Sequence, residues 1–361
     1  MMHWREGVVA RTGESWPGAI ECRVSTAAGE VRALAYTALV GEPAIGDRVL
    51  LNVSAIERAL GTGGYAFVVA RPEANPTAPD SPGHIVKARY TPQQQIVLAV
   101  DEQDSPHHAL LREADDLDGM PVVVTDLHSA LPAIIAGARS QAPDLTIAYV
   151  MPDGGALPAA FSRTVAGLRS AGWLAATITV GQAFGGDHEA VTVHTGLLAA
   201  RHVAGADLAI VIQGPGNVGT DTRWGFSGVS CAESLHAASV LGGMPCAALR
   251  VSGADARSRH RGISHHSLTA YGRALLAPAT LPVTVTGDRE LDALIEEQLE
   301  LLVQSARAPL TVARVAADGL MSALADTPVL LRTMGRGLAE DPASFLFAAA
   351  AGRWAAATAR P

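Results

Sequence analysis

Runs of apolar residues alternate with Ala- and Leu-rich segments over the central part of the chain, from about residue 94 to 286. Near-continuous apolar strands separated by helices are typical of a parallel sheet covered by helices on both faces. The pattern therefore predicts a three-layer α/β domain with a mostly parallel sheet. The strands that it predicts are residues 95–100, 121–126, 145–151, 174–181, 207–213 and 245–252.

The segments between and after these runs have helical patterns. They predict helices within residues 128–140, 159–172, 188–205, 288–304 and 343–358. The last of these contains the most apolar stretch near the C-terminus, but that stretch is only about half of the ~20 residues that a membrane span needs. We therefore expect it to form a buried helix and not a transmembrane one.

The N-terminal part follows a different pattern. Residues 1–71 alternate short β-like runs with turns rich in Gly, Pro and acidic residues, which predicts a small antiparallel β-barrel-like domain. Residues 72–83 contain four prolines and predict an extended, semi-rigid linker. The expected organisation is a barrel over 1–71, the linker, and the α/β domain with C-terminal helices over 84–361.

Composition narrows the kinds of partner that the protein is expected to bind. The formal net charge is −8, and Lys87 is the one lysine of the chain, so the long-range field that draws nucleic acid or anionic membranes is missing. Three cysteines without CxxC spacing, Cys22, Cys231 and Cys246, fit buried thiols in a reducing compartment. The N-terminus has no apolar region typical of a secretory signal, so we expect a cytoplasmic protein.

Polar and Gly-rich residues follow five successive predicted strands. In an open parallel sheet the loops at the carboxyl ends of the strands meet at one edge, where ligands bind. We therefore expect one site at this edge, and a single such loop would indicate only a turn. The candidate side chains in the first three loops are Asp126, His128, Asp153, Asp187 and His188.

The fourth loop contains GPGNVGT, in which Gly214, Gly216 and Gly219 have the spacing G-x-G-x-x-G. Such a loop lets backbone N–H groups approach a phosphate at the start of a helix. The residues after Thr220 do not open a helix cleanly, which makes a nicotinamide-binding fold unlikely here. An anion-binding nest over Gly216 to Thr220 and a plain tight loop are both open.

The third loop, FGGDHEA, also allows two interpretations. Asp187 can cap a helix whose first turn holds His188, which is ordinary helix-start chemistry. Alternatively, the two side chains are metal ligands or an acid–base pair. His188 and His194 are six residues apart and do not form the HExxH zinc motif, so a divalent metal could bind only through histidines of different loops.

The densest polar cluster is SRHRGISHHS, residues 258–267. Ser264 is expected to cap a helix with His265 and His266 in its first turn, where the positive helix end favours the neutral imidazole that suits a base or a ligand. Arg261 could hold a carboxylate or phosphate through two parallel hydrogen bonds. The alternative is that these side chains bridge two domains or two subunits.

Eight motifs occur in order along nearly the whole chain: GDRVLLN, HIVKARYTP, DLHSALPA, MPDGGALP, FGGDHEA, GPGNVGT, RHRGISHHS and TMGRGL. In these motifs the chain resembles a bacterial family catalogued as domain of unknown function number 3866. The resemblance implies a bacterial cytoplasmic protein with a polar site built from these loops, and it implies no reaction or cofactor.

Two functional hypotheses follow. The first is a hydrolase or group-transfer enzyme acting on a small anionic or phosphorylated metabolite, in which Asp187, His188, His265 and His266 are acid–base groups or metal ligands. The loop from Gly214 to Thr220, together with Arg261, would then hold the anion, and Asp126, His128 and Asp153 are further ligand-binding candidates. The second is a non-catalytic ligand-binding or regulatory protein whose β-domain recognises a partner. RNA is a weak choice of partner because acidic and basic residues nearly balance over 1–71, and a homo-oligomer is open.

Overall fold

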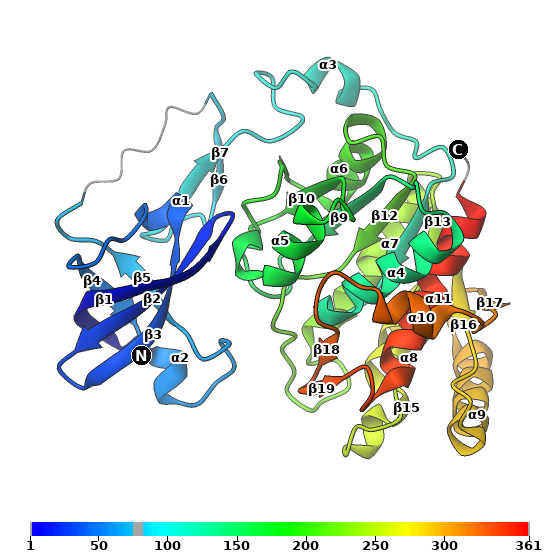
Figure 1. The fold of residues 1–361 in the computed structure, drawn as a ribbon. Coiled ribbons are helices and arrows are strands. Elements are labelled where there is room, and N and C mark those ends of the chain that lie inside the picture. The colour runs from blue at the N-terminus through cyan, green and yellow to red at the C-terminus, as the bar shows by residue number, and fades with distance from the viewer. Residues whose placement is uncertain (1, 75–81, 360–361) are drawn as a thin grey trace.

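The computed structural model describes residues 2–74 and 82–359. In Figure 1 a small barrel lies beside a larger layered domain, and the chain passes between them by way of the hairpin of β6 (Ile85–Lys87) and β7 (Gln95–Val97). The middle of the proline-rich linker, residues 75–81, lies outside the described residues. The domain boundaries therefore stay a prediction, whereas the two architectures are described below.

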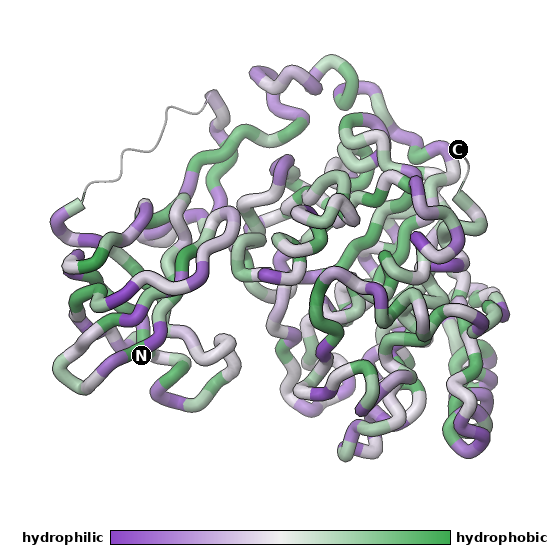
Figure 2. The backbone as a smooth tube through the Cα atoms, viewed as in Figure 1, coloured by the Kyte–Doolittle hydropathy of each residue, from purple (hydrophilic) through white to green (hydrophobic). Residues whose placement is uncertain are grey.

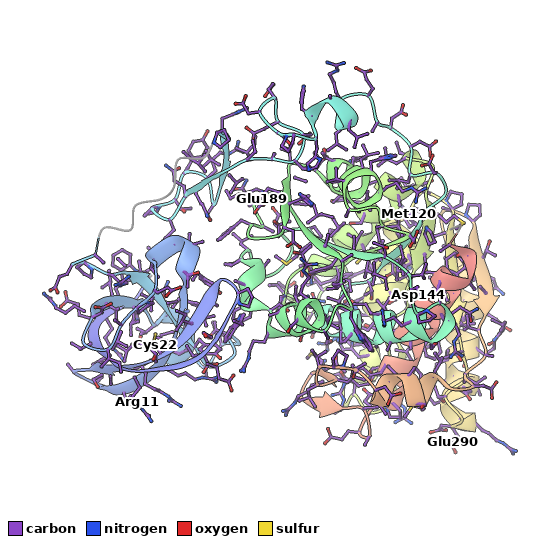
Figure 3. The ribbon with its side chains drawn as sticks, turned by 45° about the horizontal axis from the view of Figure 1, so that its top comes forward. Arg11, Cys22, Met120, Asp144, Glu189 and Glu290 are labelled. Atoms are coloured by element: carbon purple, nitrogen blue, oxygen red, sulfur yellow. The ribbon has the colours of Figure 1, made fainter. Side chains whose placement is uncertain are left out.

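The N-terminal unit is a closed five-stranded barrel in the order β1-β2-β3-β5-β4. Its strands are β1 (Trp4–Trp16), β2 (Ala19–Thr26), β3 (Gly29–Tyr36), β4 (Arg48–Asn52) and β5 (Ala66–Ala70), with short helices α1 (Thr37–Val40) and α2 (Ser54–Glu57) between them. Neighbouring strands are antiparallel except β3 and β5, which are parallel. Alternate residues face inward, so that Cys22 is buried and Arg11 is exposed on the outer surface (Figure 3). The barrel-like expectation is confirmed.

The larger domain is built on one eight-stranded parallel sheet in the order β11-β10-β9-β12-β8-β13-β16-β17. Its strands are β8 (Pro121–Val124), β9 (Ile147–Met151), β10 (Ala176–Val180), β11 (His188–Ala190), β12 (Leu208–Val211), β13 (Met244–Ala247), β16 (Ala279–Val283) and β17 (Leu310–Arg314). The central strands are buried along their whole length. Figure 2 shows apolar residues gathered along these strands, as expected for a sheet covered on both faces.

Helices cover both faces of the sheet and enclose two separate apolar cores. Packed with one core are α4 (Leu131–Gln141), α5 (Arg163–Ser170), α10 (Leu320–Ala325) and α11 (Pro342–Thr358). Packed with the other are α3 (His108–Leu111), α6 (Val193–Leu198), α7 (Cys231–Val240), α8 (His265–Thr269) and α9 (Arg289–Ser305). This arrangement confirms the three-layer α/β domain, and the three cysteines are free and buried.

The apolar C-terminal segment forms α11, which packs closely against α4. A Cβ atom on Gly352 would lie 1.8 Å from the carbonyl oxygen of Ile134, and one on Gly137 would lie equally close to that of Ala349. The two backbones therefore touch at these glycines. The segment is apolar because the helix is buried between α4 and the sheet. Among the described residues, no helix has the length and apolar character needed to cross a bilayer.

The structure corrects three details of the predicted sheet. Residues 95–100 do not form one of its strands: β7 (Gln95–Val97) pairs with β6 (Ile85–Lys87) in a separate antiparallel hairpin, and Ala99 makes one isolated bridge to Glu189 of β11. The segment after Asp187 is not a helix start but the short edge strand β11. The sheet also contains β16 and β17, which the pattern did not predict.

The single lysine holds the β6–β7 hairpin against the edge of the sheet. Lys87 is fully buried, and its ammonium group donates to the carbonyl oxygens of Ala183 and Ala190 at 3.0 and 3.1 Å. It also lies 3.2 Å from a carboxylate oxygen of Glu189. Burial lowers the pKa of Lys87 and raises that of Glu189, and the attraction between the two opposes both shifts. The pair is enclosed and serves the fold.

Candidate functional site

The strand order creates a crevice at the carboxyl end of β8. The helix that follows β8, α4, packs on one face of the sheet, whereas α7, which follows the neighbouring strand β12, packs on the opposite face. The loops after β8 and β12 therefore diverge and leave a crevice between them. Ligands of α/β proteins bind in such a crevice. Asp126, two residues beyond β8, lies at this point and is 5% exposed.

Asp126 draws together segments from three strand ends. Its Oδ2 atom accepts a hydrogen bond from Nδ2 of Asn217 at 2.8 Å, and Arg250 Nη1 lies 3.3 Å away. Nδ1 of His266 lies 2.9 Å from the same oxygen. Gly228 allows this close packing, because a Cβ atom there would lie 2.4 Å from Cβ of Asp126.

The hydrogen-bond pattern assigns the tautomer of His266. Burial raises the pKa of Asp126, but the hydrogen bond to His266 and the charge of Arg250 outweigh burial, so the pKa is lowered and the carboxylate is ionised. Nη1 of Arg250 also lies 3.0 Å from Nδ1 of His266, but this guanidinium can donate to the Asp126 carboxylate instead. An ionised oxygen and a bare ring nitrogen would repel each other at 2.9 Å, which favours the proton on Nδ1 of His266. The lone pair of His266 is then on Nε2.

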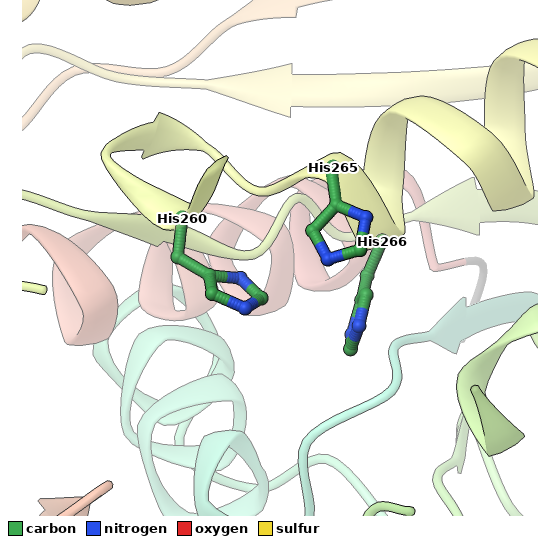
Figure 4. A group of neighbouring side chains, drawn as sticks. All are labelled: His260, His265 and His266. Carbon is green, nitrogen blue, oxygen red and sulfur yellow. The ribbon is translucent and has the colours of Figure 1, made fainter. Parts of the chain in front are cut away.

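The histidines of the segment 258–267 come together as a group. His260 ends a short 3-10 turn (Ser258–His260), and His265 and His266 open α8, whose N-cap residue Ser264 accepts from the backbone N–H of His266. This confirms the predicted cap. The ring centroids lie 4.9 Å apart for His260 and His265, 5.1 Å for His260 and His266, and 4.4 Å for His265 and His266. Figure 4 shows the three rings converging from the loop and the helix start.

Burial and nearby positive charges keep the imidazole rings of His260 and His265 neutral. Burial and the charges of Arg250 and Arg257 lower the pKa of His260 to about 3. Burial, followed by the neighbouring His266, lowers the pKa of His265. Neutral imidazoles offer lone pairs to protons or metal ions at pH 7.

The three rings face a polar cleft of about 480 Å³. Arginines 250, 257 and 259 line it, together with Phe226 and the loop over residues 217–222. Each arginine has a carboxylate partner, namely Asp126, Asp255 and Asp221 respectively. The cleft is thus rich in N–H donors without a large net charge. Arg261, the predicted anion-binding arginine, is exposed and is not among the lining residues.

Residues of the loop from Gly214 to Thr220 line two different cavities. Gly219 and Thr220 line the histidine cleft, whereas Gly216 lines a separate cavity beside the barrel and Gly214 packs against Ala156. The N–H of Thr220 donates to the carbonyl of Gly225, and that of Val218 donates to Oγ of Ser227. These two donors are used within the loop, which favours the tight loop, and the anion-binding nest stays a prediction.

Several predicted site residues do not reach the cleft. His128 is half-buried, and its ring nitrogens lie 3.1 Å from Tyr149 Oη and 2.7 Å from Ser162 Oγ. Burial lowers its pKa to about 4, so it is a neutral packing residue. Asp153 follows β9, and its carboxylate accepts from the backbone N–H of Gln182 at 3.0 Å.

Asp187 and His188 lie at the far side of the sheet from the cluster. Asp187 accepts from the backbone N–H and hydroxyl of Thr177, next to the amino end of β10, and pairs with Arg169. His188 is the first residue of β11, and its ring lies 5.8 Å from that of His107. The candidate histidines and aspartates therefore do not all meet: Asp126, His265 and His266 come together, whereas His128, Asp153, Asp187 and His188 lie elsewhere.

Sequence reasoning gave no role to other residues that the cleft contains. His260 belonged to the cluster, but nothing in the pattern distinguished it from its neighbours. Arg250 carried a usable signal, because a lone charged residue at the carboxyl end of a buried strand faces the ligand edge. The contribution of Asn217 and Phe226 depends on how the loop after β12 folds back, which has no local signature.

The fold and this site define the class of protein: a parallel α/β protein with a small β-barrel and a cleft lined by histidine and arginine at the switch point of its sheet. The chain belongs to the family described as "Protein of unknown function (DUF3866)", whose model matches residues 32–352. The resemblance stated from the motifs is thereby confirmed. The comparison with curated proteins finds no match.

Proposed function

We propose that the protein is a cytoplasmic hydrolase or group-transfer enzyme that acts on a small anionic or phosphorylated metabolite in the histidine cleft. The observation that supports this most is the pairing of a buried carboxylate with an imidazole. Asp126 fixes the tautomer of His266 and leaves Nε2 available beside the open cleft. An oriented imidazole with an available nitrogen is the usual equipment for proton transfer or metal-assisted hydrolysis.

The arginines of the cleft suit an anionic substrate. A guanidinium group has five N–H donors, and its carboxylate partners here use only some of them. The remaining donors of Arg250, Arg257 and Arg259 can bind phosphate or carboxylate oxygens. A cleft of about 480 Å³ fits a metabolite and is too small for a folded partner. Nucleic acid is not part of the proposal.

A second candidate is a non-catalytic ligand-binding or regulatory protein. A cavity of about 710 Å³ between the barrel and the α/β domain supports it, with aromatic walls from Tyr36, Phe67, Phe161 and Phe184. Apolar cavities of this size at domain interfaces are common ligand sites. An aromatic ligand that binds there, without turnover of any cleft ligand, would favour this candidate.

The test is a turnover screen with sugar phosphates, nucleotides and phosphate monoesters, followed by variants. His266→Gln should abolish any activity found, because Gln supplies neither the proton acceptor nor the Nε2 lone pair. His194→Gln is the matched control: His194 is exposed and is not among the residues that line the cleft. Equal activity of wild type and His266→Gln would contradict the proposal.

A further inference from the structure

We propose that His260, His265 and His266 together bind one divalent transition-metal ion, of which zinc is the first candidate. Each residue offers one ligand nitrogen, and these three atoms lie within 4.8 Å of one another. The ion deepens the proposed function by giving the histidines a common role. The binding site itself stands on geometry alone, and only the reaction at the metal rests on the proposed function.

The spacing of the rings fits a shared ion. Zinc–nitrogen bonds are about 2.0–2.1 Å long, which puts each ring centroid about 3.2 Å from the metal and ligand centroids about 5 Å apart in tetrahedral directions. The observed separations are 4.4, 4.9 and 5.1 Å. The rings thus already have the spacing of a three-histidine centre, and small side-chain rotations would bring the nitrogens to bonding distance.

Each ring has a nitrogen that is available for the ion. Nδ1 of His266 is bonded to Asp126, and Nδ1 of His260 lies 2.8 Å from Oγ of Ser264, which leaves Nε2 of both rings. Within the described part of the chain, neither nitrogen of His265 has a hydrogen-bond partner. Metal-binding histidines ordinarily use the second ring nitrogen to bond a carboxylate or another fixed group, as His266 does here.

Packing holds one ligand in place before any ion arrives. The ring of Phe226 stacks on that of His266 with centroids 4.0 Å apart and planes 7° from parallel. The hydrogen bond between Nδ1 of His266 and Asp126 also restricts rotation of the ring within its own plane. Asp126 is therefore a positioning residue, because it acts on the metal through His266.

The surroundings allow a cation despite the nearby arginines. Their carboxylate partners compensate the positive charge, and Arg259 and Arg257 are tied to Asp221 and Asp255 at 2.8 and 2.9 Å. Three neutral nitrogens favour zinc, cobalt, nickel or copper over magnesium or calcium, which prefer oxygen ligands. Three protein ligands leave a fourth position open to the cleft, as in catalytic and not structural zinc sites.

The experiment uses untagged full-length protein, because a polyhistidine tag binds the same metals. The protein is stripped with a chelator, dialysed, and titrated with ZnCl₂ by calorimetry, and separately with CoCl₂ while the visible spectrum is recorded. We expect one ion per chain and the absorption bands of tetrahedral cobalt. MgCl₂ should give no heat of binding.

Variants locate the site. His265→Gln and His260→Gln should each abolish stoichiometric binding, and Asp126→Asn should weaken zinc binding by about 10–100-fold, as expected for loss of a carboxylate behind a ligand. His194→Gln is the control and should bind zinc as wild type does. Melting temperatures of the stripped variants show whether each remains folded. If a variant unfolds, the cobalt spectrum of the wild type still decides the question.

The outcomes separate this inference from the proposed function. A wild-type protein that binds no zinc, or whose cobalt spectrum is that of the free hydrated ion, overturns the metal site, even if turnover is found. Zinc binding that survives in both histidine variants also overturns it. One ion bound through these histidines, with no substrate found, supports the metal site and counts only against the proposed reaction.

Discussion

Acidification should destabilise the protein through His128, because partial burial of this ring disfavours its charged form. Its pKa is about 4 in the folded chain, where burial disfavours the charged ring, and about 6.5 when unfolded. Between these values the unfolded state binds more protons than the folded state, so stability is present above pH 6.5 and is lost as the pH falls toward 4.

The magnitude follows from the difference of the two pKa values. The two pKa values differ by about 2.5, which corresponds to about 3.4 kcal/mol of the free energy of unfolding when titration is complete, and about 2 kcal/mol of this is lost between pH 8 and pH 5. Other groups also titrate in this range, so the wild-type pH dependence alone is not diagnostic. His128→Gln removes the titrating ring, keeps a polar side chain beside Tyr149 and Ser162, and isolates its contribution.

The assay is urea unfolding of both proteins at pH 8 and pH 5. The variant should be less stable than wild type at pH 8, since the buried hydrogen bonds are altered. The gap between wild type and variant should shrink by about 2 kcal/mol at pH 5. A gap that is the same at both pH values would refute the account of His128 as a neutral packing residue.

Two further predictions test contacts of the fold. Lys87→Ala leaves Glu189 buried without its partner and should lower the free energy of unfolding by about 3–5 kcal/mol, whereas adding Glu189→Gln should recover part of the loss in urea unfolding. Gly352→Ala forces a Cβ atom against the backbone of α4 and should cost at least about 1–3 kcal/mol, measured by thermal unfolding. Gly61→Ala meets open space and should change the melting temperature little; an equal effect of both substitutions would argue against the close approach of α4 and α11.

The architecture was predictable because burial on both faces leaves a strong pattern. Strands such as β9 and β12 are entirely buried and appear in the sequence as unbroken apolar runs. Two strands were missed for identifiable reasons. β16 contains Pro282, which argues against a strand, and β17 is only partly buried, as an edge strand is.

The site was only partly predictable, because sequence order locates loops but not the direction of their side chains. Asp126 and His128 are two residues apart at the same strand end, yet Asp126 bonds His266 of the cleft and His128 contacts Ser162 and Tyr149 away from it. Asp187 has the appearance of a helix cap, but its carboxylate binds the start of β10, a contact set by where the chain returns to the sheet. The three-residue strand that follows is too short to show alternation.

The histidine cluster in the cleft is the proposed metal-binding functional site. The most direct measurement is X-ray diffraction from crystals grown with zinc, with data collected on both sides of the zinc absorption edge. We expect one anomalous peak about 2.0–2.1 Å from a nitrogen of each of His260, His265 and His266, with a fourth position open to the cleft. No peak there, or a peak only at another place in the molecule, would contradict it.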